Sequence, residues 1–151
     1  MFSKAAANAL AEGLVSALDP EQLLHYLYAD YRRLSEVVSP DIVLHPFDTR
    51  RTSLHGVAEA QAHKDALIAA TDGTLRTEVE SVAVSGNYAV VAGTMRAQKV
   101  GLENLEVGFC GLWRFEDGAP VEHWEEVTGD AQKVSRWFLD ANWERPYGVP
   151  S

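Results

Sequence analysis

Cysteine is nearly absent from this chain, which has one, Cys110, among 151 residues. A single thiol cannot form a disulfide within the chain, so packing alone must hold the fold together. The N-terminus also lacks the charged, apolar and cleavage regions of a signal peptide, and no apolar run approaches the roughly 20 residues of a membrane-spanning helix. We therefore expect a soluble, cytoplasmic protein without a membrane partner.

Basic side chains are also scarce. The chain has 13 Lys and Arg against 22 Asp and Glu, a formal net charge of −9, and no basic stripe with interleaved aromatic residues. This balance argues against nucleic acid as a partner. The five histidines show neither His-x3-His nor His-Glu-x2-His spacing, which argues against a metal site. We expect no metal and no cofactor.

The N-terminal half carries apolar residues at helical spacing, which predicts three helices. The first is alanine-rich and covers residues 3–18. The second begins with an aspartate cap at Asp19, a following proline, and Gln22 placed to complete a capping box, and it should continue to Pro40. The third covers residues 56–71 and ends at an Asp-Gly pair.

The C-terminal half changes to a period of two, which predicts β-strands. Four of them should form an antiparallel meander, after a brief strand at 41–46 and a loop at 47–55, and a short helix should follow at 130–139. Helices followed by a curved sheet predict an α+β domain over residues 1–140, with the sheet wrapped around the third helix and a tail at 141–151. A sheet curved in this way has the shape of a cone, and its open end can admit a small molecule. The four meander strands are 75–84, 88–99, 105–116 and 121–127.

The last predicted strand carries a histidine and a carboxylate on one face. Side chains alternate along a strand, so Val121, His123, Glu125 and Val127 share one surface. If this surface faces inward, apolar walls shift the pKa values of both ionisable groups toward neutral pH. We therefore predict that Glu125 and His123 lie in a pocket. The alternative is an exposed strand with a solvated carboxylate.

Five other residues are candidates for contact with a substrate. Trp113 and Phe109 on the third meander strand would form the floor of the pocket or simply pack in the core, and Gly111 between them would open space for a ligand. His63 lies on the apolar face of the third helix, where it is either a pocket residue or a structural histidine. Arg50 would clamp an anionic group at the mouth, or belong to an exposed loop.

Two segments carry a family resemblance that covers most of residues 20–140. They are Asp-Ile-Val-Leu-His-Pro at 41–46 and Leu-Trp-Arg-Phe-Glu-Asp-Gly-x2-Val-Glu-His-Trp-Glu at 112–125. With the order of elements, they resemble the SnoaL-like polyketide cyclase branch of the nuclear transport factor 2-like superfamily. The resemblance implies a cone-shaped α+β barrel, usually dimeric through its outer sheet face, with a deep pocket between sheet and helices. Members include cyclases, isomerases, dehydratases and epoxide hydrolases, so the fold alone does not decide the function.

The resemblance also implies roles for particular residues. The similar motif of the cyclases generally ends His-Trp-Asp, whose aspartate is the expected proton-abstracting base, and Glu125 stands at that position. In ketosteroid isomerase the base is an aspartate before a proline at the end of the first strand, where this chain has His45. That enzyme's oxyanion-donating aspartate would fall near Gly111, which has no side chain, so its mechanism does not transfer.

These observations lead to one functional hypothesis and one alternative. The hypothesis is a cofactor-independent acid–base enzyme, a cyclase, isomerase or dehydratase, acting on a small apolar, polyketide-like carbonyl compound. Glu125 would remove a proton, and His123 or His45 would donate one to the developing enolate oxygen. The expected partners are a small hydrophobic molecule and a second copy of the chain. The alternative is a non-catalytic domain of the same fold that binds a small ligand or dimerises.

Overall fold

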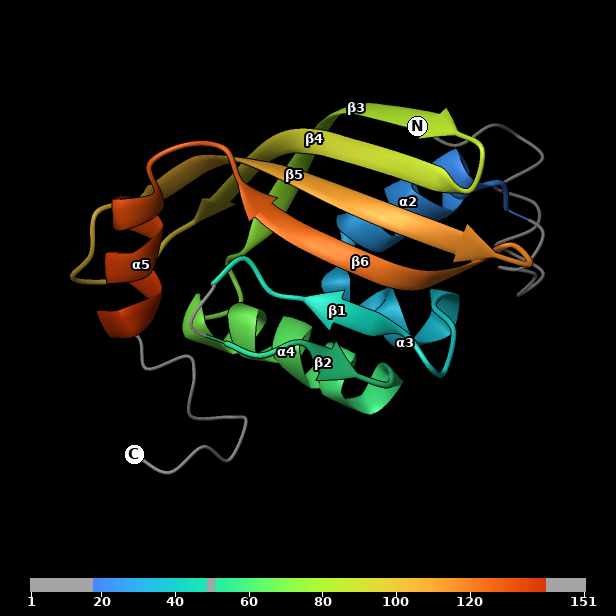
Figure 1. The fold of residues 1–151 in the computed structure, drawn as a ribbon. Helices are drawn as coiled ribbons and strands as arrows, with labels where there is room; N and C mark the ends of the chain where they lie inside the picture. The colour runs from blue at the N-terminus through green and yellow to red at the C-terminus, as the bar shows by residue number, and fades with distance from the viewer. Residues whose placement is uncertain (1–17, 49–50, 141–151) are drawn as a thin grey trace.

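A computed structural model describes residues 18–48 and 51–140 of the chain. The predicted helix over residues 3–18, except for its last residue, lies outside the described part, as do Arg50 and the predicted tail at 141–151. The described residues form an α+β fold built on one curved, six-stranded sheet that does not close into a barrel, in the order β2-β1-β6-β5-β4-β3 (Figure 1). The predicted fold class is confirmed.

The predicted antiparallel meander is present. It consists of β3 (Arg76–Ser85), β4 (Tyr88–Ala97), β5 (Leu105–Glu116) and β6 (Ala119–Val127), each antiparallel to the next. The turn between β5 and β6 is made by Asp117 and Gly118, with φ values of 51° and 81°. Positive φ at both central residues is the geometry of a tight hairpin turn that matches the twist of its strands.

Two short strands extend the sheet beyond β6 and add a parallel pairing to the antiparallel meander. β1 (Val43–His45) pairs parallel with β6 and antiparallel with β2 (Leu54–His55). The sheet is therefore mixed, and the predicted loop at 47–55 ends in a strand. Hydrophobic spacing within β1 is the same for either pairing direction, so it could not reveal this arrangement.

The second predicted helix begins as expected but ends early. In α2 (Pro20–Ala29) the capping box is complete: the Gln22 amide donates to Asp19 Oδ1 over 2.8 Å, and the Asp19 amide donates to Gln22 Oε1 over 3.1 Å. The prediction of one helix up to Pro40 is wrong, because Asp30 is extended at φ −159° and its carboxylate accepts from the Arg32 amide over 3.0 Å. An aspartate that bonds to the backbone ahead of it competes with helix continuation. The chain then forms two short turns, η2 (Tyr31–Arg33) and α3 (Leu34–Val37).

The third predicted helix, α4 (Val57–Ala70), is confirmed, and a last helix, α5 (Ala131–Asp140), lies at one end of the sheet (Figure 1). α4 follows Gly56, whose φ of +90° few other residues adopt, and it is rich in alanine, which favours helix. None of the helices in the described part is long and apolar enough to cross a membrane.

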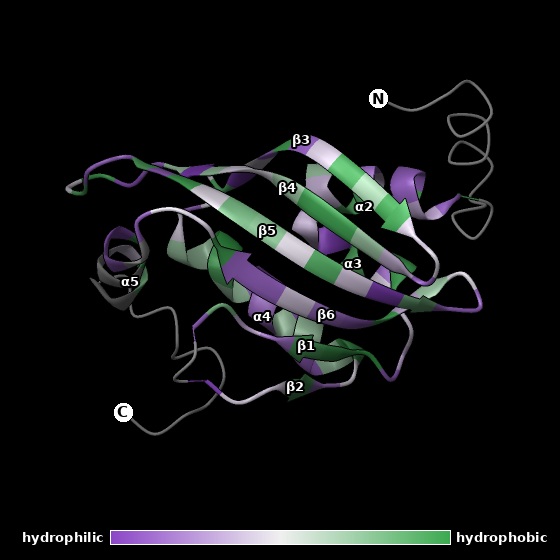
Figure 2. Cartoon of the chain, turned by 45° about the horizontal axis from the view of Figure 1, so that its top comes forward, coloured by the Kyte–Doolittle hydropathy of each residue, from purple (hydrophilic) through white to green (hydrophobic). Residues whose placement is uncertain are grey.

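The core lies between the inner face of the sheet and the helices α2 and α4. Phe109 and Trp113 of β5 point into it, and so does Phe115. β5 is an inner strand of the sheet, and its other face is half-buried at Cys110 and Leu112. Figure 2 shows the contrast between apolar β5 and its more hydrophilic neighbour β6. Because β6 is polar yet partly buried, its inward-facing polar groups need partners from elsewhere in the fold.

Candidate functional site

Strand β6 turns a histidine and a carboxylate toward the core. His123 lies opposite Trp113, and Glu125 lies opposite Gly111, in the register between β5 and β6. Both side chains point to the inner face, while Glu122 on the same strand bonds to partners on the outer face. The predicted alternation and the predicted placement of these two groups in the interior therefore hold.

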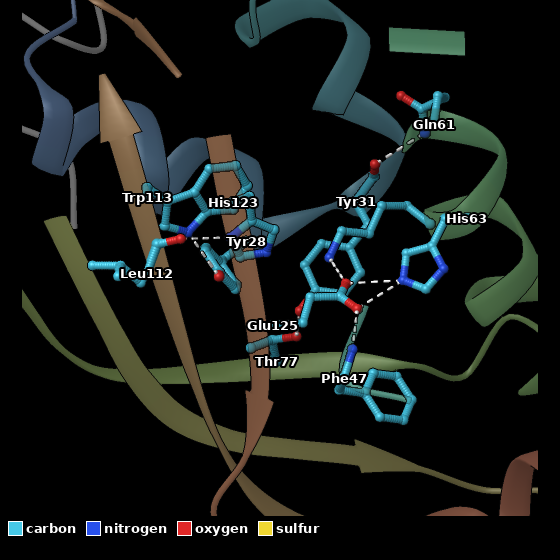
Figure 3. Close-up of polar contacts among 11 residues, drawn as sticks. Tyr28, Tyr31, Phe47, Gln61, His63, Thr77, Leu112, Trp113, His123 and Glu125 are labelled. Atoms are coloured by element: carbon cyan, nitrogen blue, oxygen red, sulfur yellow. Dashed lines mark hydrogen bonds and ion pairs between the residues drawn. The ribbon is translucent and has the colours of Figure 1, made fainter. Parts of the chain in front are cut away.

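Glu125 is held by three hydrogen-bond donors (Figure 3). His63 Nε2 donates to its two oxygens over 2.8 and 3.0 Å, Lys64 Nζ lies 2.5 Å from Oε2, and the Phe47 amide donates to Oε1 over 3.2 Å. The side chains are almost out of solvent, with exposures of 9 % for Glu125, 3 % for Lys64 and 0 % for His63. The three donors make four contacts with a carboxylate that offers about four acceptor positions, so its oxygens are fully engaged.

The charge state of Glu125 differs from the expectation. Burial raises the pKa of this carboxyl, but the His63 ring and the Lys64 ammonium lower it, and the net result is a pKa well below the ordinary value. The prediction that apolar surroundings would raise the pKa of Glu125 toward neutral pH is wrong, because it did not take His63 and Lys64 into account. Glu125 is an ionised carboxylate at neutral pH.

Lys64 is one of the cavity-lining residues that the sequence analysis missed. The buried face of α4 carries Ala60, His63, Lys64 and Leu67, spaced by three and four residues. This is the apolar stripe on which His63 was noticed, and Lys64 sits inside it. A lysine within such a stripe is a signal for a buried counter-ion, since an ammonium is rarely buried without a carboxylate partner.

His123 is a neutral, structurally fixed imidazole. Its Nδ1–H donates to the Leu112 carbonyl oxygen over 3.0 Å, and its ring stacks on Trp113 with centroids 3.5 Å apart and planes 11° apart. Desolvation, followed by the charge on Lys64, lowers its pKa to about 3. A neutral imidazole can donate only through its N–H, which is already engaged here. This geometry does not favour the predicted role of His123 as proton donor.

Tyr28 supplies a hydroxyl that the sequence analysis did not single out. The Trp113 Nε1–H donates to the Tyr28 oxygen over 3.1 Å, as Figure 3 shows. Burial raises the pKa of this phenol well above its usual value, so the hydroxyl keeps its proton. Gly111 makes room for it, because a Cβ at that position would collide with the hydroxyl and touch the edge of His123. The space that Gly111 was expected to leave for a ligand is therefore taken by Tyr28.

The charged and phenolic groups surround one small cavity. Its volume is about 30 Å³, close to the space that one water molecule occupies in the liquid. Among the predicted residues, Phe109, Gly111, His123 and Glu125 line it, whereas Trp113 lies behind them in the core. Its other lining residues include Tyr28, Tyr31, Phe47, Lys64, Leu67, Met95 and Val127.

His45 does not join this cluster, which corrects its predicted link to the pocket. In the parallel pairing of β1 with β6 it lies opposite Trp124, so it shares the outer face with that residue and with Glu122. Its Nε2 lies 2.7 Å from Glu122 Oε2, and its ring stacks on Trp124. Arg50 lies outside the described residues. Within the part of the chain that the structure describes, no three His, Cys, Asp or Glu side chains converge to hold a metal ion.

The chain matches a known family over much of its length. The sequence profile of the family described as SnoaL-like domain matches residues 22–123. No curated protein matches the sequence. Several solved structures have similar folds. One of them is a protein from Jannaschia sp. CCS1 that is named as a SnoaL-like polyketide cyclase. It is 18 % identical in sequence, the match covers 76 % of this chain and 88 % of that one, and the TM-score is 0.64.

Two further solved structures share the fold at similar distance. An NTF2-like protein of unknown function from Burkholderia pseudomallei K96243 has 20 % identity, coverage of 88 % of this chain and 91 % of that one, and a TM-score of 0.54. TerC, crystallised with polyporic acid, has 16 % identity, coverage of 89 % and 93 %, and a TM-score of 0.57. At such low identities the likeness concerns the fold alone.

Proposed function

Because the chain belongs to the SnoaL-like family, we propose that it is a cofactor-independent acid–base enzyme acting on a small, largely apolar carbonyl compound, as a cyclase, isomerase or dehydratase. One observation carries this proposal. A buried ionised carboxylate, Glu125, and a buried neutral phenol, Tyr28, line the same apolar cavity. These are the two groups that removal of a proton next to a carbonyl requires.

Glu125 is the base in this proposal. It removes the proton from the carbon next to the carbonyl, and because its pKa is lowered it is ionised and ready at neutral pH. The same low pKa makes it a weak base. A carboxylate that is a weak base can nevertheless act in this way where the enolate oxygen is strongly stabilised, as in ketosteroid isomerase, whose aspartate base has a pKa of only about 4.6. The proposal therefore requires a good donor for that oxygen.

Tyr28 is the donor, in place of the histidines that the sequence suggested. Its oxygen already accepts from Trp113 Nε1–H, and a hydroxyl that accepts one hydrogen bond donates a stronger one. Loss of one such donor typically costs about 10²–10³ in rate. Lys64, which also lines the cavity, adds positive charge close to the developing enolate.

The substrate class follows from the lining and from the similar structures. Phe47, Leu67, Met95, Phe109 and Val127 give the cavity apolar walls. One similar structure is named as a polyketide cyclase and another was crystallised with polyporic acid, so polyketide-like carbonyl compounds are the first class to test. Such molecules need about 300 Å³ or more, so a substrate must push lining side chains aside as it enters.

Hydrogen exchange into the substrate tests the base directly. The protein is incubated in D2O with a panel of polyketide-like ketones and enones, and mass spectrometry follows deuterium uptake next to the carbonyl. The wild type should exchange at least one compound, and Glu125→Gln should lose the activity. Glu106→Gln is the matched control, since Glu106 is a 68 % exposed carboxylate on β5. Equal exchange by the wild type and Glu125→Gln refutes Glu125 as the base.

One observation favours the alternative of a non-catalytic binding domain. The cavity of about 30 Å³ is small for a substrate, and Glu125 is engaged by three donors. If no compound exchanges but one binds equally well to the wild type and Glu125→Gln by calorimetry, the domain is a binding module.

A second copy of the chain remains the proposed partner. The outer sheet face exposes Tyr88 by 44 % and Val90 by 37 %, and its β3–β4 region carries both signs of charge in Arg96 and Glu78. A two-fold interface pairs each surface with itself, so a patch with both signs can match its own copy. Light scattering at micromolar concentration should report a dimer, and Val90→Glu should convert it to a monomer. A monomeric wild type contradicts this proposal.

A further inference from the structure

A second set of reactive side chains lies away from the cavity, on the outer face of the sheet. Ser53 Oγ lies 2.7 Å from His45 Nδ1, and His45 Nε2 lies 2.7 Å from Glu122 Oε2. A hydroxyl, an imidazole and a carboxylate thus form one continuous hydrogen-bonded chain. This is the arrangement in which a base activates a nucleophile and a third group orients the base.

Contacts within the fold hold the carboxylate and the imidazole of this hydrogen-bonded series in place. Arg114 donates to Glu122 Oε1 from Nε over 3.3 Å and from Nη2 over 3.2 Å, which leaves Oε2 for His45. The hydrogen bond from His45 lowers the pKa of Glu122 and Arg114 adds to this effect, so the carboxylate is ionised. The His45 ring stacks on Trp124, with centroids 5.3 Å apart and planes 18° apart. The imidazole therefore cannot rotate freely out of line.

The ionised carboxylate determines the tautomer of His45. A carboxylate only accepts hydrogen bonds, so Nε2 of His45 must carry the proton that points to Glu122. In the neutral ring Nδ1 then holds the lone pair, and it faces the Ser53 hydroxyl. The hydroxyl donates to Nδ1, which is the direction of proton transfer that a serine nucleophile needs.

We propose that Ser53, His45 and Glu122 form a nucleophilic triad that reacts with small activated esters. Ser53 Oγ attacks the acyl carbon while His45 Nδ1 takes the hydroxyl proton, and the ester bond to the alkoxide breaks. The alkoxide leaves with the proton from His45, and the acyl group stays on Ser53. Water then attacks the acyl-serine with His45 as base, which releases the carboxylic acid and restores the hydroxyl.

The position of the triad sets the size of its substrate. The side chains of His45 and Glu122 are 32 % and 22 % exposed, so a small ester and water reach them from solvent. The triad lies toward the β1–β2 edge of the sheet, whereas Tyr88 and Val90 are on β4 near the opposite edge. A second copy bound over β4 would leave the triad accessible. This inference does not depend on the proposed function of the inner cavity.

Two reagents test the triad. A fluorophosphonate forms a stable adduct with an activated serine with loss of fluoride, and peptide mass spectrometry locates the adduct. p-Nitrophenyl acetate reports turnover through release of nitrophenolate. Ser53 should be labelled, and Ser81, an exposed serine on β3, should not be. His45→Gln should slow both reactions by on the order of 10²-fold, the lower range for loss of a general base.

Further variants separate the possible outcomes. Glu106→Gln, which replaces an exposed carboxylate outside both sites, should keep full labelling of Ser53. Ser53→Ala should abolish nitrophenolate release while Ser81→Ala should leave it unchanged, and circular dichroism checks that each variant folds. If Ser53 reacts no faster than Ser81, or reacts equally in His45→Gln, the triad is only a structural link between the β1–β2 segment and β6.

Discussion

Replacement of Glu125 by glutamine is the sharpest test of the buried charge cluster. Glutamine keeps the shape of the side chain but removes its charge, and it leaves the ammonium of Lys64, which is 3 % exposed, without a counter-ion. Removing one partner of a buried ion pair costs about 3–5 kcal/mol. Since the amide oxygen still accepts one hydrogen bond, we expect the lower end, ~3 kcal/mol. For a chain of this size this corresponds to a fall in Tm of about 6–12 °C.

The assay is thermal unfolding by calorimetry, with a double-mutant cycle. Lys64→Met removes the ammonium, and the double variant Glu125→Gln/Lys64→Met removes both charges. The double variant should be less destabilised than the sum of the single variants, with a coupling energy of about 1–3 kcal/mol. Glu106→Gln is the control, because its partner Arg96 lies 3.6 Å away at the surface and such pairs contribute less than about 1 kcal/mol.

The pH dependence of unfolding provides an independent check on whether the Glu125 charge stabilises the folded chain. The folded pKa of Glu125 lies below the value of about 4.3 expected in the unfolded chain. Its stabilisation is therefore complete above about pH 4.3 and is lost as the pH falls through the folded pKa. The difference in stability between the wild type and Glu125→Gln should shrink below about pH 4.3. If the Tm values of the wild type and Glu125→Gln differ by less than about 2 °C at neutral pH, or if their difference does not vary with pH, the cluster does not stabilise the fold as argued.

Three further predictions concern other parts of the structure. His123 has a folded pKa of about 3, below the ordinary 6.5, so its contribution to stability should decline as the pH falls from 6.5 toward 3. The pH dependence of the unfolding free energy over this range should therefore be flatter in His123→Gln than in the wild type. Gly111→Ala should cost about 1–3 kcal/mol by overpacking, and adding Tyr28→Phe should recover part of that loss in urea unfolding, since the colliding hydroxyl is gone. Asp19→Ala should cost about 1 kcal/mol by loss of the capping box, whereas Asp19→Asn should cost less.

Local patterns predicted the parts of the fold that depend on neighbours in sequence. The capping box at Asp19 and Gln22 needs residues three apart, and the inward placement of His123 and Glu125 needs only the alternation of one strand. These predictions hold because the same short-range geometry operates in the folded chain. The break at Asp30 is also local, but it competes with an otherwise continuous helical pattern, and spacing alone favoured the helix.

Long-range pairings decided what the sequence could not predict. Lys64 meets Glu125 across 61 positions, and His63 meets it across 62. Their convergence, and hence the lowered pKa of the carboxyl, depends on how α4 lies against β6. The face on which His45 lies depends likewise on the parallel register between β1 and β6. A shift of that register by one residue would turn His45 to the opposite face, so no pattern within its own strand could place it.

Stability alone gives little reason for the Glu125 cluster to exist. Well-packed apolar residues of similar volume are often as stabilising as a buried ion pair, or more so, and they leave no charge to desolvate. The cluster nevertheless lies on the wall of a cavity that the Tyr28 hydroxyl also lines. If Glu125 acts as the base there, its low pKa means that the rate must depend on stabilisation of the enolate more than on base strength. Tyr28→Phe should then slow exchange about as severely as loss of an oxyanion donor, ~10²-fold, with no change in the charge of the site.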